Sequence, residues 1–468
     1  MYRKRTAPSC ITLQTRFAIT RRQLAALAIS MLLITGCAEP RPEIGEIGAI
    51  DGFVGGAVVE EPRAALVARD ILSAGGTAAD AAAAAYFTMT VTYPVAVGLG
   101  GGGVCLYYDR SSEKVETVDF RLRPPSAGGA IAVPGALRGM ALLHSRYGRM
   151  QWGALLSPAE KMARFGHQIS RALAKRIAPQ AGRLKNDAMA ARLFLHADGT
   201  PKGEAENLLQ VELASVLTRI RTRGVGDIYG GQAGRQFLQS ASGQGGAATI
   251  TDLRSYRAIW RETASRKVGN HMLHVPMFAP GESPELKLIN LASGNAGEDI
   301  AANLFAQADV AMTMDRGEGG FVIGDSFGSA AACVFQMNGA FGTGRMVANL
   351  GIFTAPTINR ALDPALERGA DAWPGYPLPL LGVNEPLGQV VMAGVGVGGP
   401  NGAAAAAQIS MATMGQDKSL AKAMADSHGN GDGRVQALWC AKGLRVGQKT
   451  CQFATDPKGF GLAAFDKF

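Results

Sequence analysis

A run of glycines near residue 100 is the first feature of this sequence that suggests chemistry. Gly98-Leu-Gly-Gly-Gly-Gly103 precedes two alternating apolar runs, 104–109 and 115–121, so the glycines lie at the entrance of a β-hairpin. A phosphate-binding loop requires a Gly-Lys-Ser/Thr and a following helix, and this sequence has neither at this position. We therefore expect these glycines to allow close packing of the backbone.

Two histidines have a spacing that is found in some metal sites. His271 and His274 form an HxxH, but the surrounding run is strand-like and no acidic third ligand follows nearby. We interpret both as surface or core residues, and the sequence predicts no metal and no cofactor.

The first 36 residues have the composition of an export signal. Basic residues end at Arg21-Arg22, an apolar run follows over 24–34, and Leu33-Ile-Thr-Gly-Cys37 resembles a bacterial lipobox. The apolar run is too short to span a bilayer comfortably. We expect an exported protein that is lipid-anchored at Cys37, faces the periplasm in the bacterial cell envelope, and has a tether over 37–50. Thr20-Arg-Arg-Gln-Leu24 is read either as a twin-arginine signal or as an ordinary basic segment.

The positive charge of the chain lies mostly in this leader. Six of the 47 Lys and Arg residues precede Cys37, and without them 41 basic residues face 38 acidic ones, a net charge of +3. No basic stripe interleaved with aromatic residues follows, so the sequence predicts no nucleic-acid partner. In an oxidising compartment Cys440 and Cys451, on either side of a short turn-like segment, form either a hairpin disulfide or two unpaired thiols.

Alternating and helical spacings predict a layered α/β body. Pro62 opens a helix that Gly75-Gly76 ends, and Thr77-Ala-Ala-Asp80 is typical of a capping box for a second, alanine-rich buried helix. We expect Ser157-Pro-Ala-Glu160 to start a later helix in the same way. Further helices are predicted over 206–223 and 403–414. Strands are predicted over 321–325, 329–337, 390–397 and 435–440.

Taken together, the motifs of this sequence resemble those of the gamma-glutamyltransferase (gamma-glutamyltranspeptidase) family. The motifs that carry the resemblance occur in the family's order over about four fifths of the chain. They include Ala74-Gly-Gly-Thr-Ala-Ala-Asp-Ala81, the glycine loop 98–103, Asp119-Phe-Arg121, Val133-Pro-Gly135, Asn338-Gly-Ala-Phe-Gly-Thr-Gly344, Gly398-Gly-Pro-Asn-Gly402 and Thr455-Asp-Pro-Lys-Gly459. The resemblance implies the N-terminal-nucleophile hydrolase fold, a four-layer αββα sandwich, with a large-subunit-like region over 51–317 and a small-subunit-like region over 318–468 in the same body.

The family's chemistry assigns roles to several positions of this chain. A precursor cleaves itself, and the hydroxyl of the new N-terminal threonine attacks a gamma-glutamyl amide with its own α-amine as base. Arg121 matches the family's carboxylate-binding arginine, with a structural salt bridge as the alternative, and Asn338 matches an asparagine near the glutamyl pocket. Asn401 and Gly402 match the paired glycines of the oxyanion turn, one of them replaced.

The nucleophile does not match. Counting back from 341–344 without gaps places the family's Thr-Thr-His on Glu318-Gly-Gly320, and a carboxylate cannot replace a hydroxyl that has an adjacent amine. Thr313, five residues upstream, and Ser326 are weak alternatives. The family's serine pair is replaced by Leu381-Gly382, and its acidic segment by 354–359.

Two functional interpretations therefore stay open. The first is an exported family member that is catalytically degenerate, remains uncleaved, and acts by binding a gamma-glutamyl or other small amide ligand or a protein partner of unknown identity. The second is an active gamma-glutamyl hydrolase or transpeptidase on glutathione-like compounds, or a related acylase, with a nucleophile elsewhere.

Overall fold

Helix α3 (Ala78–Thr92) is buried along its whole length, as its alanine-rich sequence predicts. Thr77 caps it through the predicted capping box, in which Asp80 accepts a hydrogen bond from the backbone N–H of Thr77 and donates its own backbone N–H to the Thr77 hydroxyl. Helix α2 (Pro62–Ser73) packs beside α3 and ends just before Gly75-Gly76. These two helices cover the central sheet on one side.

The computed structural model describes residues 55–278, 284–294, 315–357, 378–427, 433–445 and 450–465. All of them belong to one compact unit of the chain, residues 44–468. Cys37, Thr313 and Asn359, as well as the leader and most of the tether, lie outside the described residues.

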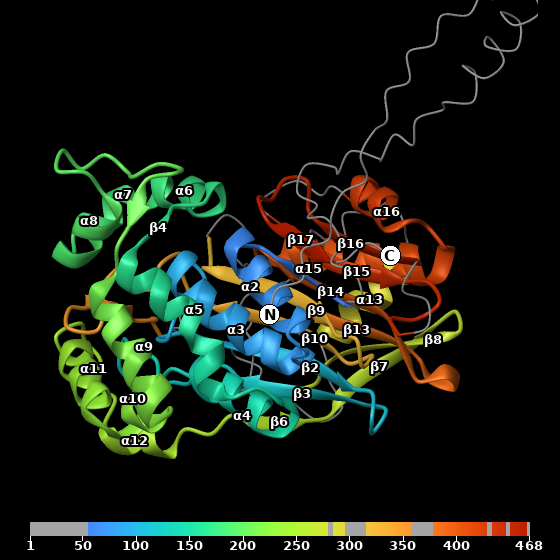
Figure 1. Cartoon of the computed structure of the whole chain (residues 1–468), viewed down its shortest axis with the longest axis horizontal. Coiled ribbons are helices and arrows are strands. Elements are labelled where there is room, and N and C mark those ends of the chain that lie inside the picture. The colour runs from blue at the N-terminus through green and yellow to red at the C-terminus, as the bar shows by residue number, and fades with distance from the viewer. Residues whose placement is uncertain are drawn as a thin grey trace, which may run out of the picture. The chain divides into compact units, whose positions relative to one another are not determined.

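Two antiparallel sheets form the centre of this unit (Figure 1). The seven-stranded sheet has the order β17 (Leu462–Phe465), β1 (Gly56–Val59), β9 (Glu318–Gly324), β10 (Ala330–Gln336), β2 (Gly102–Asp109), β3 (Lys114–Phe120) and β6 (Ile259–Arg261). The six-stranded sheet has the order β16 (Cys451–Thr455), β15 (Arg434–Cys440), β14 (Gln389–Val397), β13 (Leu378–Asn384), β8 (His271–Pro276) and β7 (Thr263–Val268). Each sheet takes strands from both sides of residue 317.

Three clusters of buried apolar residues lie between successive layers of sheets and helices. Between the sheets, residues such as Val322 and Val395 form one cluster. A larger cluster joins the outer face of the seven-stranded sheet to the helices around α3, and a third joins the six-stranded sheet to α13, α15 and α16. The four-layer αββα arrangement that the sequence predicted is thereby confirmed.

The helices follow the chain in this order: α2, α3, α4 (Ala136–Tyr147), α5 (Trp152–Phe165), α6 (Arg171–Ile177), η1 (Ala178–Gln180), α7 (Ala181–Leu184), α8 (Ala188–Phe194), α9 (Val211–Arg223), α10 (Gly226–Gly230), α11 (Gln232–Ser242), α12 (Ile250–Ser255), α13 (Pro284–Gly294), η4 (Glu385–Leu387), α15 (Pro400–Gln416) and α16 (Leu420–Asp426). Short pairs β4–β5 (His167–Gln168, Asn207–Leu208) and β11–β12 (Met346–Val347, Ile352–Phe353) complete the described elements. No described helix combines the length and the hydropathy that a membrane span requires.

One helix start differs from the prediction. We expected a helix to begin at Ser157-Pro158, but α5 begins at Trp152 and contains Pro158. Tertiary packing overrides the local signal, because the Trp152 ring packs edge-on against Phe87 of α3 at a centroid distance of 5.2 Å and Leu155 is fully buried.

The glycine loop packs closely, as expected. A Cβ atom on Gly100 would lie 2.1 Å from the carbonyl oxygen of Phe353, and one on Gly103 would lie 2.2 Å from that of Val334. Neither position can accept a side chain, so these glycines serve the fold and need no phosphate to explain them.

Candidate functional site

Glu318, the first residue of β9, points its side chain at the turn before helix α15. Its Oε2 atom accepts hydrogen bonds from the backbone N–H of Gly398 at 2.9 Å and of Gly399 at 2.8 Å. Gly399 is the N-cap residue of α15 and has a φ of +73°, a conformation that favours glycine. The N-terminus of a helix attracts anions because its N–H groups have no partner within the helix. The Glu318 carboxylate is thus the anion bound at this turn.

Burial makes this carboxylate unusual. Glu318 is 1% exposed, and burial raises its pKa, although the N–H groups of Gly399 and Gly398 and the charge of Arg316 oppose that shift. Its second oxygen, Oε1, has no hydrogen-bond partner among the described residues. The two glycine N–H groups are therefore the contacts that compensate for burying this side chain.

The guanidinium of Arg176, from helix α6, contacts the chain at Asp315 and at Glu318. Arg176 donates from Nη1 to the carbonyl oxygen of Glu318 at 3.1 Å and pairs with the Asp315 carboxylate through Nε and Nη2. Arg176 also donates to the hydroxyl of Tyr93 at 2.9 Å. Burial alone would lower the pKa of Arg176, but Tyr93, Asp315 and Glu60 outweigh it, so the pKa is raised and the group stays charged.

A second buried carboxylate lies beside this arginine. Glu60 follows β1, is 1% exposed, and accepts hydrogen bonds from Tyr93 and from Arg434 of β15. A Cβ atom on Gly319 would lie 3.2 Å from Glu60 Oε2, which places this carboxylate directly against the start of β9. Glu60, Arg176 and Arg434 thus form a charged cluster around residues 315–319, where the two sheets meet.

The side chain of Arg121 forms an ion pair with another residue of the protein, Asp119. It donates from Nε and Nη2 to the two oxygens of Asp119, at 3.0 Å each, and its guanidinium lies over the Phe278 ring at 3.8 Å. Asp119 also accepts from Arg261 at 2.8 Å. The strand register aligns Glu318 with Gln336 and Gln336 with Gly102, while Gly103 pairs with Phe120. Arg121 therefore lies at the same end of the sheet as Glu318, three strands or roughly 14 Å away.

The amide of Asn338 is also used internally. Asn338 donates from Nδ2 to the carbonyl oxygen of Pro356 at 2.9 Å and accepts from Gln336 Nε2 at 2.7 Å. Its φ of +55° places it in the left-handed region, where asparagine is better tolerated than most residues. Gln336 is the sheet neighbour of Glu318, so Asn338 lies at the same end of the sheet.

Comparisons with known proteins give this geometry its context. The family model described as gamma-glutamyltranspeptidase matches residues 64–283. The glutathione hydrolase proenzyme of Escherichia coli is 25% identical over 330 residues, 64% of this chain and 56% of that protein, and the one from Bacillus subtilis is 29% identical over 258 residues, 49% of this chain and 44% of that protein. The solved structure of a cephalosporin acylase from Bacillus halodurans, 18% identical, superposes with a TM-score of 0.66 and covers 93% of this chain and all of that one, which supports the fold.

This chain contains a region of the gamma-glutamyltranspeptidase family, residues 64–283. It spans about half the length of the curated glutathione hydrolases named above.

The sequence predicts that Glu318 takes the place of the family's threonine nucleophile. Leu381, which the sequence predicts to replace the first serine of the family's serine pair, is fully buried. Among the described residues, this arrangement brings a carboxylate, and no hydroxyl of the expected kind, to the start of β9.

The turn uses other N–H groups than those the sequence indicated. Asn401 and Gly402 lie in the first turn of α15, and the N–H of Gly402 donates to the carbonyl oxygen of Gly399 at 3.1 Å. The N–H groups that contact Glu318 belong to Gly398 and Gly399. Sequence reasoning missed these two donors because helix geometry, rather than residue type, decides which N–H groups are unpaired.

Of the two weak nucleophile candidates, the described Ser326 lies far from this turn. Ser326 follows the opposite end of β9, eight residues from Glu318, which corresponds to roughly 26 Å along an extended strand. Thr313 lies outside the described residues. Arg176 and Glu60, in contrast, reach the site without any signal in the sequence, apart from the unusual pair of acidic residues at 60–61 before helix α2.

Two disulfides tie the sheets. Cys440 and Cys451 are joined across the register of β15 and β16, so the structure selects the hairpin disulfide over two unpaired thiols. Cys105 and Cys333 are joined between β2 and β10, a pair that the sequence did not indicate because 228 positions separate them.

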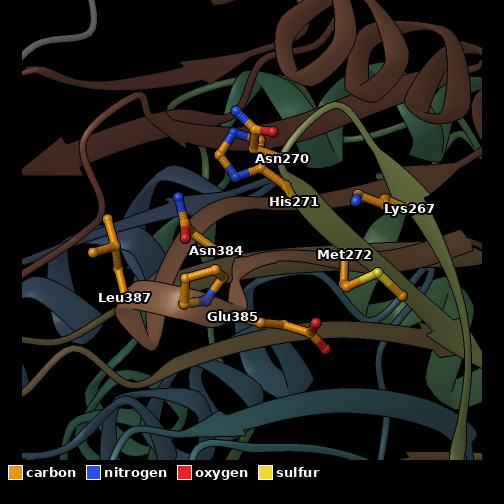
Figure 2. Close-up of a pocket in the computed structure, with 8 residues that line it drawn as sticks. Lys267, Asn270, His271, Met272, Asn384, Glu385 and Leu387 are labelled. Carbon is orange, nitrogen blue, oxygen red and sulfur yellow. The ribbon is translucent and has the colours of Figure 1, made fainter.

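A hollow with a defined lining lies elsewhere in the described part of the chain. Figure 2 shows it between the β7–β8 turn and the β13–β14 turn, lined by Lys267, Asn270, His271, Met272 and residues 384–387, with a volume of about 440 Å³. These turns lie at the opposite end of β14 from Gly398. His274 accepts from or donates to Thr263 at 3.0 Å, burial lowers its pKa to about 4, and no described group of three or more metal-ligating side chains is present.

Proposed function

We propose that this chain is a pseudoenzyme of the gamma-glutamyltranspeptidase family, which stays uncleaved and acts by binding rather than by catalysis. The observation that carries the proposal is the pair of hydrogen bonds from Gly398 and Gly399 to the Glu318 carboxylate. An oxyanion formed during acyl transfer needs such donors, and here a side chain of the protein itself engages them.

The chemistry of residue 318 supports the same proposal. Acyl transfer by an N-terminal nucleophile requires a hydroxyl and a free α-amine on one residue. Glu318 offers a buried carboxylate in place of that hydroxyl. Arg176 further holds Asp315 and the Glu318 carbonyl oxygen together across this junction, which favours an intact chain.

We place this pseudoenzyme in the bacterial cell envelope, exported by its leader and anchored through a lipid on Cys37. The two disulfides support an oxidising compartment, because such bonds persist outside the cytosol. Its ligand is a gamma-glutamyl compound or another small amide, since glutathione hydrolases and an acylase proenzyme from Pseudomonas are among its relatives. A protein partner is the alternative occupant.

The experiment that separates binding from catalysis is a denaturing gel of the purified, exported protein. We expect one band near full length, because no self-cleavage occurs, together with no release of chromogenic amine from a gamma-glutamyl anilide. Two bands whose sizes correspond to cleavage near residue 317 would overturn the proposal. An active gamma-glutamyl hydrolase or acylase is then the function, and Thr313→Ala and Ser326→Ala identify its nucleophile by which of them abolishes cleavage.

Binding is measured on the same protein by isothermal titration calorimetry with glutathione. Arg121→Lys, which keeps the charge but loses the planar fork, serves as the matched variant. We expect heat of binding for the unaltered chain and a weaker affinity for the variant. If the unaltered chain gives no heat with glutathione, the ligand proposal fails while the uncleaved state is still tested by the gel.

A further inference from the structure

The segment from α5 through α9 carries a net positive charge that the rest of the chain after Cys37 does not carry. Residues 152–223 contain 12 Lys and Arg against 6 Asp and Glu, a net charge of +6. The other residues after Cys37 contain 29 basic and 32 acidic residues, a net charge of −3. One part of the molecule is therefore electropositive on a body that is otherwise slightly negative.

Several of these cations are exposed and have no ion-pair partner among the described residues. Lys161, Lys175, Lys185 and Arg223 are of this kind. Others in the segment, such as Arg171 with Glu204, are paired at the surface and contribute less to the field. The unpaired cations are available to an anionic partner.

Three large apolar side chains are exposed within the same segment. Phe165 is 76% exposed, Val211 52% and Leu209 46%. We call these three residues the Phe165 patch. Phe165 is the last residue of α5, and the other two residues lie just before and at the start of α9.

Backbone pairing brings the members of the Phe165 patch together. His167 pairs with Leu208 in β4–β5, so the antiparallel register continues to place Leu209 opposite Gly166. The N–H of Gln210 donates to the carbonyl oxygen of Ala163 at 3.0 Å, which holds the start of α9 against the end of α5. Lys161 lies one helical turn before Phe165 on the same face of α5. A cation thus borders the apolar patch.

We propose that the Phe165 patch, with Lys161 beside it on a segment of net charge +6, docks the protein on an anionic phospholipid surface. Exposed aromatic and aliphatic side chains enter the headgroup region, and lysines beside them contact lipid phosphates. The net charge of +6 on residues 152–223 complements the negative surface of a membrane that contains anionic lipids. This inference goes beyond the proposed function, because it holds whether or not the chain is catalytic.

The length of chain before the body is compatible with this contact. The described body starts at Gly55, and the 17 residues 38–54 span at most about 60 Å when fully extended. A body tethered at Cys37 in this way can turn the helices α5–α9 toward the membrane. A lipid anchor alone would hold the chain near the bilayer without fixing its orientation, and the Phe165 patch supplies that orientation.

The test is co-sedimentation with vesicles, using a chain that begins at Ala38 and carries no lipid. This chain retains every described helix and strand, since all of them follow residue 55. We expect it to bind vesicles of phosphatidylcholine that contain phosphatidylglycerol, to bind pure phosphatidylcholine vesicles at least about tenfold more weakly, and to be released by salt.

Variants assign the binding to the patch. Phe165→Ser combined with Leu209→Ser is expected to weaken binding to the anionic vesicles at least about tenfold, while Phe165→Trp retains it. Lys161→Glu is expected to weaken binding and its salt dependence together. Leu387→Ser is the matched control, because Leu387 is 60% exposed but lies on η4 at the β13–β14 turn. All variants change exposed residues, and equal circular dichroism spectra verify their fold.

Three results would overturn the proposal. Failure of the unaltered chain to bind anionic vesicles is the first. Equal binding by the Phe165→Ser/Leu209→Ser variant and the Leu387→Ser control is the second. The third is a dimer in sedimentation velocity that Phe165→Ser dissociates, since the patch would then belong to a contact between two copies of the chain.

Discussion

The Oε2 atom of Glu318 lies 2.8 Å from the backbone nitrogen of Gly399, so the first residue of β9 is bound by the N-cap of α15. This contact joins the two sheets at the end where Arg176, Glu60 and Arg434 also meet. Any ligand that needs the N–H groups of Gly398 and Gly399 must displace the carboxylate of Glu318. The predictions below concern this contact, the cluster around it, and the bonds that hold the strands in place.

Replacing Glu318 by alanine is expected to open an anion site. The variant loses two charge-assisted hydrogen bonds and leaves two N–H groups buried without a partner, which costs about 2–4 kcal/mol of unfolding free energy. Formate should restore part of this loss, because its carboxylate fits between the same donors. Urea unfolding with and without formate measures both effects. Glu385→Ala, at an exposed position of η4, is the control, and an equal formate effect in both variants would contradict the prediction.

Replacing Arg176 by methionine is expected to destabilise the fold by about 3–5 kcal/mol. The buried carboxylates of Asp315 and Glu60 then lack their shared cation, while methionine keeps much of the side-chain volume. Arg171→Met changes an exposed arginine of the same helix that pairs with Glu204, and we expect its thermal midpoint to remain unchanged. Differential scanning calorimetry compares the two variants. Similar midpoints would mean that Arg176 is not essential to the cluster.

Asp325 should give the stability of the protein a distinct pH dependence. Burial raises the pKa of Asp325 to about 6, although the N–H groups of Ala78, Ser329 and Phe327 oppose the shift. The folded state therefore holds a proton that the unfolded chain releases near pH 4. As the pH rises from 4 to 6, the unfolding free energy falls by about 3 kcal/mol. Below pH 4 and above pH 6 this contribution is constant.

Asp325→Asn removes this titration and isolates its share. The variant loses some hydrogen bonding and starts from a lower stability, but its unfolding free energy should decline less between pH 4 and 6. Chemical denaturation across this range, taken as the difference between the two proteins, separates Asp325 from Glu318 and Glu61, whose pKa values burial also raises. A difference that does not vary with pH would refute the assignment.

The two disulfides should contribute unequally. The bond between Cys105 and Cys333 closes a loop of 228 residues, and the bond between Cys440 and Cys451 a loop of 11. Loop entropy gives about 5 kcal/mol for the longer loop and about 3 kcal/mol for the shorter one. Cys105→Ala/Cys333→Ala is therefore expected to lower the urea midpoint more than Cys440→Ala/Cys451→Ala. The reverse order would show that strain or residual structure in the unfolded chain dominates.

Local sequence was sufficient for the elements that local interactions stabilise. The capping box of Thr77 and Asp80 predicted the start of α3, and alternation predicted β2, β3, β9 and β10, because caps and side-chain periodicity act within a few residues. The glycine loop and the ordered motifs predicted the family and its layered fold. The lipid anchor on Cys37 lies outside the described residues and stays a prediction, and so does Thr313, a weak alternative for the nucleophile.

The sequence by itself determined that a carboxylate stands at the aligned nucleophile position and that a glycine turn opens α15. The tertiary structure alone decided that Gly398 and Gly399 bind this carboxylate. It also decided that Arg176 reaches the backbone carbonyl oxygen of Glu318 from 142 residues away, and that Cys105 meets Cys333. The same cause separates these results from the predictable ones. Each depends on how two sheets and distant helices pack against one another, and packing over long sequence distances leaves no periodicity or cap for a reader of the sequence to find.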